Sequence, residues 1–553
     1  MSFRLSSVLP LMAVFLMSVF SHKISGSTIQ GYAEMSVTAG SKIHFRVKST
    51  ADSFKVAWYR YGKPSNKSKQ ESFTGRYSTS DYDTGFNEII GSSGYRIPLV
   101  KISELGPFPV IPQPPDDNDA YMTGCNWVVS CTINIPEAWD SDLYLAKLYD
   151  NQGNNSFVPV IIRSSSPGTQ ASIVVIASTN TWQAYNEYGG ASFYTCNRPS
   201  CSDNSFIVNY DRPLSNTAPS LTGHLSGIDH FILNFLKSNG LAYEQLCDLD
   251  LNEAAASDLL KNYKVVILAG HSEYWSANMQ SAIESFLDQG GKLVNLSGNT
   301  MFWEVQFDGK RMEKVKRWRN VIPGGEFGFL GAGLNGGGNS PACAGFRVLR
   351  NHWIFSNTAM QQDSLFGNSG INQHHSGCPD GSSGASGWEF DVIGPGSPPQ
   401  CGDSIWNNCL ELLARGVNLT YAGEEKGANM YLFHRGGGSN IFAAPSITFT
   451  GSLAVDSVLQ KIVMNVLEAF LADSVPGPEE SCCNGQKGDL TQDGNNGDLL
   501  DLTFLVDYIF RGGPQAGCLN AADVNGDNAP SNILDLTLLV DYIFRNGAAP
   551  GPC

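Results

Sequence analysis

Three segments of the chain share one pattern, in which an apolar run of β-type residues ends and is followed at once by polar and aromatic side chains. The runs span residues 173–177, 265–270 and 293–296. Strands buried in a parallel sheet are continuous apolar runs, and ligands of open sheets bind outside the carboxyl ends of the strands. The side chains that follow the runs are therefore our first site candidates: Tyr185, His271, Glu273 and Asn299.

The sequence between these runs supports parallel pairing. Residues 229–238 and 277–289 carry apolar side chains at helical spacing, and each segment stops at a pair that breaks helices, Asn239-Gly240 or Gly290-Gly291. Strands that alternate with helices of this length predict crossover connections and a parallel sheet. We therefore expect a central α/β domain.

Length and charge limit the class of protein. A chain of 553 residues is too long for one core, so we expect three or four domains, and the net charge of −16 argues against a nucleic-acid partner. Residues 1–21 place Arg4 before the apolar stretch 8–20, which is too short to span a bilayer. This pattern predicts a signal peptide, and hence a secreted or cell-surface protein without a membrane span.

The cysteines are consistent with an oxidising compartment. The chain contains 13 cysteines. It has no CxxC pair of the kind that would indicate a structural zinc site. Their connectivity stays open, but some lie close enough in sequence to form local disulfides: Cys125 with Cys131, Cys196 with Cys201, and Cys401 with Cys409.

The composition changes along the chain and predicts domain boundaries. Residues 28–165 contain alternating runs at 41–47, 54–62 and 142–149, which is typical of a β-sandwich, and a Pro-rich loop at 106–115. The predicted α/β domain covers 168–470. Its second half, from about residue 321, is rich in glycine, so we expect long loops over the active end of the sheet. Residues 471–486 read as a linker.

The last segment, 487–553, contains an internal repeat. Residues 501–511 and 535–545 match at an offset of 34 residues, and an acidic loop precedes each copy. Oxygen side chains at loop positions 1, 3 and 5, with a sharp turn at position 6, suit Ca²⁺. The predicted calcium ligands are Asp489, Thr491, Asp493 and Asp501 in the first copy, and Asp523, Asn525, Asp527 and Asp535 in the second. The alternative is a solvated acidic surface.

These paired loops and helices resemble a type I dockerin over the last 65 residues. In both copies the closing aspartate stands one residue later than in the usual loop. The resemblance implies a small all-α, calcium-binding module at the C-terminus. A cohesin-like protein is a candidate partner of such a module, but the sequence does not encode whether one exists.

The central motifs carry a second resemblance. Residues 181–194, Gly270-His-Ser-Glu-Tyr-Trp275 and Gly298-Asn-Thr300 resemble the large (β) subunit of N,N-dimethylformamidase, and the likeness extends over most of residues 30–470. It implies a β domain before a glutamine-amidotransferase-like α/β domain, with a mononuclear iron. The residues that it assigns to iron are Tyr185, Tyr194 and Glu273, and those that it assigns to the active site are His271, Asn299 and, as a candidate for a further glutamate, Glu389.

The chemistry of this set is consistent, because two phenolates and a carboxylate balance the positive charge of a ferric ion. Such an ion can polarise an amide carbonyl. Two other interpretations are weaker. Gly270-His-Ser272 is similar to a nucleophile elbow, but Tyr274 stands where that motif requires glycine. The pair His374-His375 lies in a Gly/Ser-rich loop, and we interpret it as solvent-exposed rather than as a second metal site.

The sequence thus predicts an exported, iron-dependent hydrolase of a C–N (amide-type) bond, with a small amide or a glycan-derived molecule as substrate. The alternative is a non-catalytic or polysaccharide-associated secreted protein that attaches through its C-terminal module. A family does not fix a substrate, and the oligomeric state stays open.

Overall fold

The fold is taken from a computed structural model of the chain. The model describes residues 29–61, 87–90, 96–115, 119–197, 205–215, 228–253, 255–334, 345–371, 384–401, 408–417, 427–476, 483, 486–491, 493–514, 516, 518–527 and 529–551. The predicted signal peptide lies outside these residues. None of the helices that the model describes is long and apolar enough to span a membrane.

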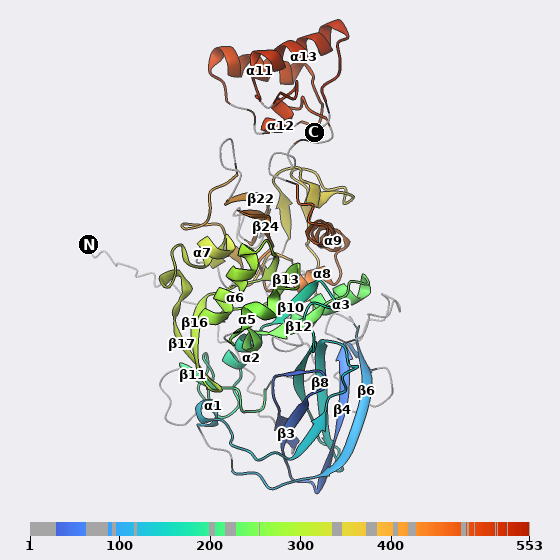
Figure 1. The fold of residues 1–553 in the computed structure, drawn as a ribbon, viewed down its shortest axis with the longest axis vertical. Coiled ribbons are helices and arrows are strands. Elements are labelled where there is room, and N and C mark those ends of the chain that lie inside the picture. Colours follow the sequence, from blue (N-terminus) through green and yellow to red (C-terminus); the bar gives the residue numbers. More distant parts are fainter. Residues whose placement is uncertain are drawn as a thin grey trace, which may run out of the picture.

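Two sheets enclose the N-terminal core (Figure 1). One has the order β1 (Ile29–Tyr32), β3 (Lys42–Ser49), β7 (Cys131–Asn134). The other has the order β2 (Ser36–Thr38), β9 (Asn155–Arg163), β8 (Asp142–Asp150), β4 (Ser53–Tyr61), β6 (Arg96–Pro109), β5 (Asn87–Ile90). Both sheets contribute to one cluster, in which the ring centroids of Phe45 and Trp58 lie 5.7 Å apart. Residues 106–109, predicted as loop, belong to β6.

A nine-stranded mixed sheet forms the centre of the molecule. Its parallel part has the order β12 (Glu244–Cys247), β10 (Ile173–Ala177), β13 (Val265–Gly270), β15 (Lys292–Ser297), β24 (Ser439–Ala443). The antiparallel part continues with β23 (Asn429–Gly436), β22 (Cys409–Gly416), β19 (Phe346–Val348), β20 (Leu365–Phe366). Strands β10, β13 and β15 are buried along their whole length, which explains their continuous apolar sequence.

Helices cover this sheet, and the two predicted from spacing are confirmed as α3 (His230–Ser238) and α6 (Ala277–Asp288). Helix α6 starts where Ser276 accepts a hydrogen bond from the Met279 amide, and its apolar residues face the core. The remaining helices of this region are α2 (Thr179–Ala184), α4 (Asp248–Leu251), α5 (Ala256–Leu260), α7 (Gly325–Leu330), α8 (Phe449–Leu453) and α9 (Ser457–Leu471); the short α1 (Ala120–Thr123) precedes them.

Two further sheets accompany the mixed sheet. The larger has the order β11 (Ile207–Asn209), β17 (Arg311–Arg317), β16 (Trp303–Asp308), β14 (Tyr274–Ser276). The smaller pairs β18 (Gly333–Leu334) with β21 (Asp391–Val392). Because β14 starts one residue after Glu273, the larger sheet adjoins the predicted site.

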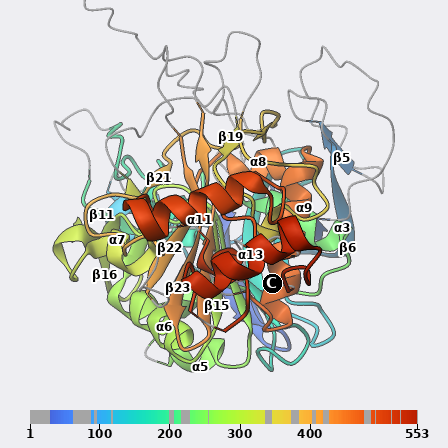
Figure 2. The same cartoon turned by 90° about the horizontal axis from the view of Figure 1, so that it is seen from above.

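The C-terminal segment contains α11 (Leu499–Arg511), α12 (Leu519–Ala522) and α13 (Ile533–Arg545). Figure 1 shows α11 and α13 at one end of the molecule, and Figure 2 shows them side by side across that end. Leucines of both helices, among them Leu505 and Leu539, share a small apolar cluster.

The predicted fold class is wrong. It combined a β-sandwich, an α/β domain with a parallel sheet and a small all-α module at the C-terminus. The chain is instead multidomain and β-rich: its main sheet is mixed, and its C-terminal helices do not form a separate small all-α module. The prediction failed because the Gly-rich sequence after residue 321, which we assigned to loops, supplies the antiparallel strands β19, β20, β22 and β23. The predicted domain boundaries stay predictions.

Candidate functional site

The ends of three adjacent strands bring the predicted residues together. Strand β10 leads into α2, whose C-cap is Tyr185; β13 ends just before His271 and Glu273; β15 ends two residues before Asn299. Strand β13 pairs in parallel with both β10 and β15. Their carboxyl ends therefore lie at one edge of the sheet, which is where the sequence pattern places the site.

Glu273 is the centre of this cluster and is only 2% exposed. The Tyr194 hydroxyl donates to its Oε1 at 2.7 Å and to its Oε2 at 2.9 Å. The Tyr185 hydroxyl donates to Oε2 at 3.3 Å, and Nε2 of His271 lies 3.3 Å from the same oxygen. The two tyrosine rings stack, with centroids 4.2 Å apart. One carboxylate thus gathers both predicted tyrosines and the predicted histidine.

Glu389 supplies a second carboxylate from the loop before β21. Its Oε2 lies 3.0 Å from His271 Nε2 and accepts a hydrogen bond from Asn299 Nδ2 at 3.1 Å. Ligand atoms of His271, Glu273 and Glu389 all lie within 4.8 Å of one another, a spacing that could hold a metal ion. Glu273 therefore belongs to two candidate ligand sets, one with the tyrosines and one with His271 and Glu389.

Glycine allows the backbone to make this approach. A Cβ at Gly298 would lie 2.2 Å from the carbonyl oxygen of Glu389, so a side chain at this position would push the two segments apart. Asn299 and Glu389 both have positive φ, 48° and 46°. A left-handed conformation is costly for glutamate, about 1 to 3 kcal/mol. In this conformation the Glu389 carboxylate contacts His271 and Asn299.

Burial dominates the electrostatics of the site. It raises the pKa of Glu273 to about 7 and the pKa values of Tyr185 and Tyr194 above their usual range, and the neighbouring negative charges add to the effect. Burial thus disfavours the charged forms of all three oxygen acids in the protein alone. A bound cation would reverse this preference, so the donor set fits a hard metal ion.

The raised pKa of Glu273 predicts how the stability of metal-free protein depends on pH. A carboxyl whose pKa is raised from 4.5 to about 7 by folding contributes stability below its unfolded pKa and loses it as pH rises through the folded pKa. We expect the melting temperature of metal-free protein to fall between about pH 5 and pH 8, and to fall less in Glu273→Gln. Calorimetry at a series of pH values checks this. Parallel curves for the two proteins would contradict it.

Three residues of the site were not selected from the sequence. The Tyr274 hydroxyl contacts that of Tyr194. Asp229 accepts a hydrogen bond from Trp182 Nε1 at 2.5 Å, and burial raises its pKa to about 7. Lys314 of β17 stands over the Tyr194 ring with its Nζ 5.7 Å from the centroid. Sequence patterns could have indicated Tyr274, which neighbours Glu273, but nothing in the alternation of β17 marks Lys314.

The two acidic loops of the C-terminal segment have matching hydrogen bonds. In the first loop the amide and hydroxyl of Thr491 donate to Asp501 Oδ1 at 2.9 and 3.0 Å, and the Asp493 amide donates to Asp489 Oδ1 at 3.0 Å. The second loop repeats this arrangement: Asn525 donates to Asp535, and Asp527 donates to Asp523.

Asp501 and Asp535 are fully buried, and each points from the first turn of its helix into the loop. Buried carboxylates that face a loop of oxygen side chains fit a hard cation such as Ca²⁺. In this structure the carboxylates of Asp501 and Asp535 accept hydrogen bonds from backbone amides. Among the His, Cys, Asp and Glu side chains of the described residues, only the His271, Glu273 and Glu389 group brings three ligand atoms within 4.8 Å of one another.

Other sequence predictions have mixed outcomes. Cys401 and Cys409 form a disulfide, and Cys196 is disulfide-bonded, although Cys201 lies outside the described residues. The predicted link between Cys125 and Cys131 is wrong, because both are buried without bridging to each other. The pair His374-His375 also lies outside the part of the chain that the structure describes.

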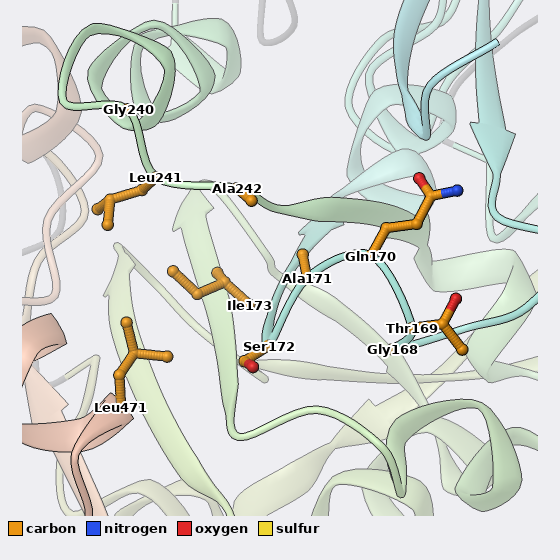
Figure 3. A pocket seen from close by; sticks show the side chains of 10 residues that line it. All are labelled: Gly168, Thr169, Gln170, Ala171, Ser172, Ile173, Gly240, Leu241, Ala242 and Leu471. Carbon is orange, nitrogen blue, oxygen red and sulfur yellow. The ribbon is translucent and has the colours of Figure 1, made fainter. Parts of the chain in front are cut away.

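A cavity of about 350 Å³ lies at the opposite end of the main sheet (Figure 3). Its lining includes Ile173, the first residue of β10, and Leu471 at the end of α9. The side chains of the candidate site instead follow the last residue of β10. The cavity is therefore separate from this site.

Comparisons with known proteins match the part of the chain that contains the site. The family model for the N,N-dimethylformamidase beta subunit-like C-terminal region matches residues 100–462. The chain is 24% identical over 439 residues to an N,N-dimethylformamidase beta subunit of an Alcaligenes species, and 23% identical over 438 residues to one of Paracoccus aminophilus. Each alignment covers 65% of this chain and 56% of the relative, so the chain spans little more than half the length of either protein.

A solved structure, murine CEACAM1b, aligns with 27% of this chain and 61% of its own at 14% identity and a TM-score of 0.09, which is too weak to inform the fold. The family match is much broader. It extends over well over half of the chain, and this protein therefore belongs to the N,N-dimethylformamidase beta subunit-like family.

Proposed function

We propose that the protein is an exported, iron-dependent hydrolase that cleaves a C–N (amide-type) bond. The observation that carries the proposal is the convergence of two tyrosines on the buried Glu273, beside His271 and Glu389. The names of the relatives support amide hydrolysis. The Cys401–Cys409 disulfide supports export, because disulfides persist in oxidising compartments.

Tyr185, Tyr194 and Glu273 would hold a mononuclear Fe³⁺, since all three offer hard anionic oxygen ligands when deprotonated. When bound, such an ion supplies Lewis acidity toward a substrate carbonyl and lowers the pKa of a bound water. Aromatic stacking fixes the direction of both phenol groups toward the Glu273 carboxylate. The alternative set with His271 and Glu389 shares Glu273, so Glu273 is required in either arrangement.

His271 and Glu389 form the proton-handling pair of the proposed mechanism. Burial lowers the pKa of His271, but the charges of Glu389 and Glu273 outweigh it and raise the pKa overall. His271 can therefore hold a proton at Nε2, 3.0 Å from Glu389 Oε2. Glu389 would accept the proton of the attacking water, and His271 would return one to the leaving nitrogen.

Asn299 supplies the neutral donor of the site. Its Nδ2 donates to Glu389 in the structure, and in the proposed mechanism it would donate to the substrate carbonyl oxygen as that oxygen gains negative charge. Asn299→Ala is expected to keep the metal and to lose roughly 10² to 10³ in rate, the usual magnitude for removing an oxyanion donor. Amine release from a panel of formamides, small N-substituted amides and N-acetylated sugars measures the loss. Full activity of Asn299→Ala would mean that the donor lies elsewhere.

The same panel separates the two substrate classes, small amides and glycan-derived amides. It also tests the alternative function, in which the protein binds glycans without catalysis. Iron-loaded protein that cleaves no amide of the panel yet binds insoluble polysaccharide would favour that alternative.

We also propose that the two acidic loops bind Ca²⁺ through the eight predicted ligands, as in a dockerin. The surfaces of α11 and α13 support a docking role, because each helix leaves three large apolar side chains more than half exposed at matching positions. These are Leu499, Leu500 and Phe510 on α11, and Ile533, Leu534 and Phe544 on α13. Exposed apolar groups repeated in this way are typical of a protein-binding surface, so a cohesin-like partner stays our proposal.

A further inference from the structure

We propose that Arg212 is a positioning residue that fixes the segment 185–194, and with it the two tyrosines of the site. The segment starts at Tyr185 and ends at Tyr194, and only an isolated bridge between Ala191 and Cys196 gives it regular structure. Something other than strand pairing must therefore set the distance between the two phenol oxygens. The proposal rests on the proposed function for its chemical meaning, but the experiment below tests the two separately.

The guanidinium of Arg212 hydrogen-bonds along this segment and is 1% exposed. Nη1 donates to the carbonyl oxygens of Tyr188 at 2.6 Å and Ala191 at 3.2 Å, and Nη2 donates to that of Gln183 at 3.0 Å. Nε donates to the carbonyl of Asn209 at 2.9 Å, which ties the segment to β11. One planar group thus joins the end of α2, the middle of the segment and a neighbouring strand.

The partners of Arg212 are unusual for a buried cation. They are the four backbone carbonyls and the side-chain oxygen of Gln183, with no carboxylate among these described contacts. Burial lowers the pKa of Arg212 to about 9. A buried charge of this kind costs stability, and neutral packing of similar volume is often more stable. The buried guanidinium of Arg212 is therefore better explained by the backbone carbonyls that it holds in place than by a contribution to the stability of the fold.

A second contact holds the segment at Gly189. Gly189 has a φ of 82°, and a Cβ there would lie 2.5 Å from the Tyr121 amide nitrogen of α1. The same amide donates to the Gly189 carbonyl at 3.3 Å. The segment is therefore clamped between Arg212 and α1. Loss of either contact should displace the tyrosines.

Lysine cannot replace Arg212 in this role. The guanidinium is planar and points five N–H donors in fixed directions, whereas an ammonium is a single point charge on a flexible chain. Arg212→Lys keeps the positive charge but loses the planar set of N–H donors. The variant therefore distinguishes the effect of the hydrogen bonds on the segment from the effect of the charge. Gly189→Ala is a second, independent variant, because it leaves Arg212 intact and disturbs the clamp on the α1 side.

The experiment compares full-length wild type, Arg212→Lys, Gly189→Ala and Arg163→Met. Arg163 is the matched control: it is partly buried at the end of β9, outside the tyrosine segment, and it pairs with Asp250 at 3.1 Å. Each metal-free protein is titrated with ferric iron while the visible phenolate absorption is recorded. Hydrogen exchange of residues 186–193 is measured on the same metal-free samples.

We expect Arg212→Lys and Gly189→Ala to lose at least about tenfold in iron affinity and to exchange faster over residues 186–193, while Arg163→Met matches wild type in both. Wild-type behaviour of Arg212→Lys in both measurements would overturn the inference. So would an equal loss in Arg163→Met, because that would show general destabilisation. If wild type binds no iron, the proposed function fails, and hydrogen exchange alone then decides the role of Arg212.

Discussion

Glu273→Gln is expected to abolish metal binding and to reduce amide hydrolysis to background. The substitution keeps the shape of the side chain but removes the negative charge of the carboxylate that both tyrosines and His271 contact. A neutral amide is a poor ligand for a hard cation, and it offers the two phenols one acceptor oxygen in place of the two of a carboxylate. Metal analysis, the visible spectrum and amine release from formamides give three independent readouts of one change.

Glu411→Gln is the matched control for this substitution. Glu411 is also a buried carboxylate in the main sheet and lies between two histidines, with Oε2 2.9 Å from His434 Nε2 and 3.4 Å from His352 Nε2. The pKa of Glu411 is held far below its usual range by these histidines against the opposing effect of burial. We expect Glu411→Gln to lower stability and to keep the metal. If Glu273→Gln retained metal and activity, both candidate sets of metal ligands would be excluded, because each contains Glu273.

Removal of calcium is expected to unfold the C-terminal segment. Asp501 and Asp535 are buried beside further aspartates, and like charges brought together without a cation oppose folding. A ligand present at 1,000 times its Kd stabilises the folded state by about 4 kcal/mol, so excess calcium and excess chelator should give clearly different melting curves. Hydrogen exchange of residues 487–551 in the full-length protein localises the transition.

The double variant Asp501→Ala/Asp535→Ala should remove the calcium dependence. Its control is Asp507→Ala/Asp541→Ala on the same helices, where each aspartate pairs with an arginine at 2.8 Å on the exposed surface. Exposed pairs of this kind contribute little, so the control should keep the dependence. A cohesin-like partner should bind the control and not the Asp501/Asp535 variant. If the chelator leaves the melting curve of the wild-type protein unchanged, the alternative interpretation of the loops as a solvated acidic surface is favoured.

Local sequence determined much of what these experiments address. Continuous apolar runs identified β10, β13 and β15, and parallel pairing then required that Tyr185, His271, Glu273 and Asn299 share one edge. This inference works because buried parallel strands admit few polar residues, so the polar groups that follow them are informative. The repeat at the C-terminus likewise gave the positions of α11 and α13.

The tertiary structure decided what lies far apart in sequence. Glu389 reaches His271 only because Gly298 allows two backbone segments to approach each other, and no local pattern encodes that contact. The antiparallel strands of the main sheet lie after residue 321, in a region whose glycine-rich segments led us to expect loops, so the fold class did not follow from propensity. Arg212 reads as an ordinary surface residue in the sequence. Its proposed role arises only when carbonyls from the end of α2 and from the following segment meet at its guanidinium, because the position of a backbone oxygen depends on the whole fold and not on neighbouring residues.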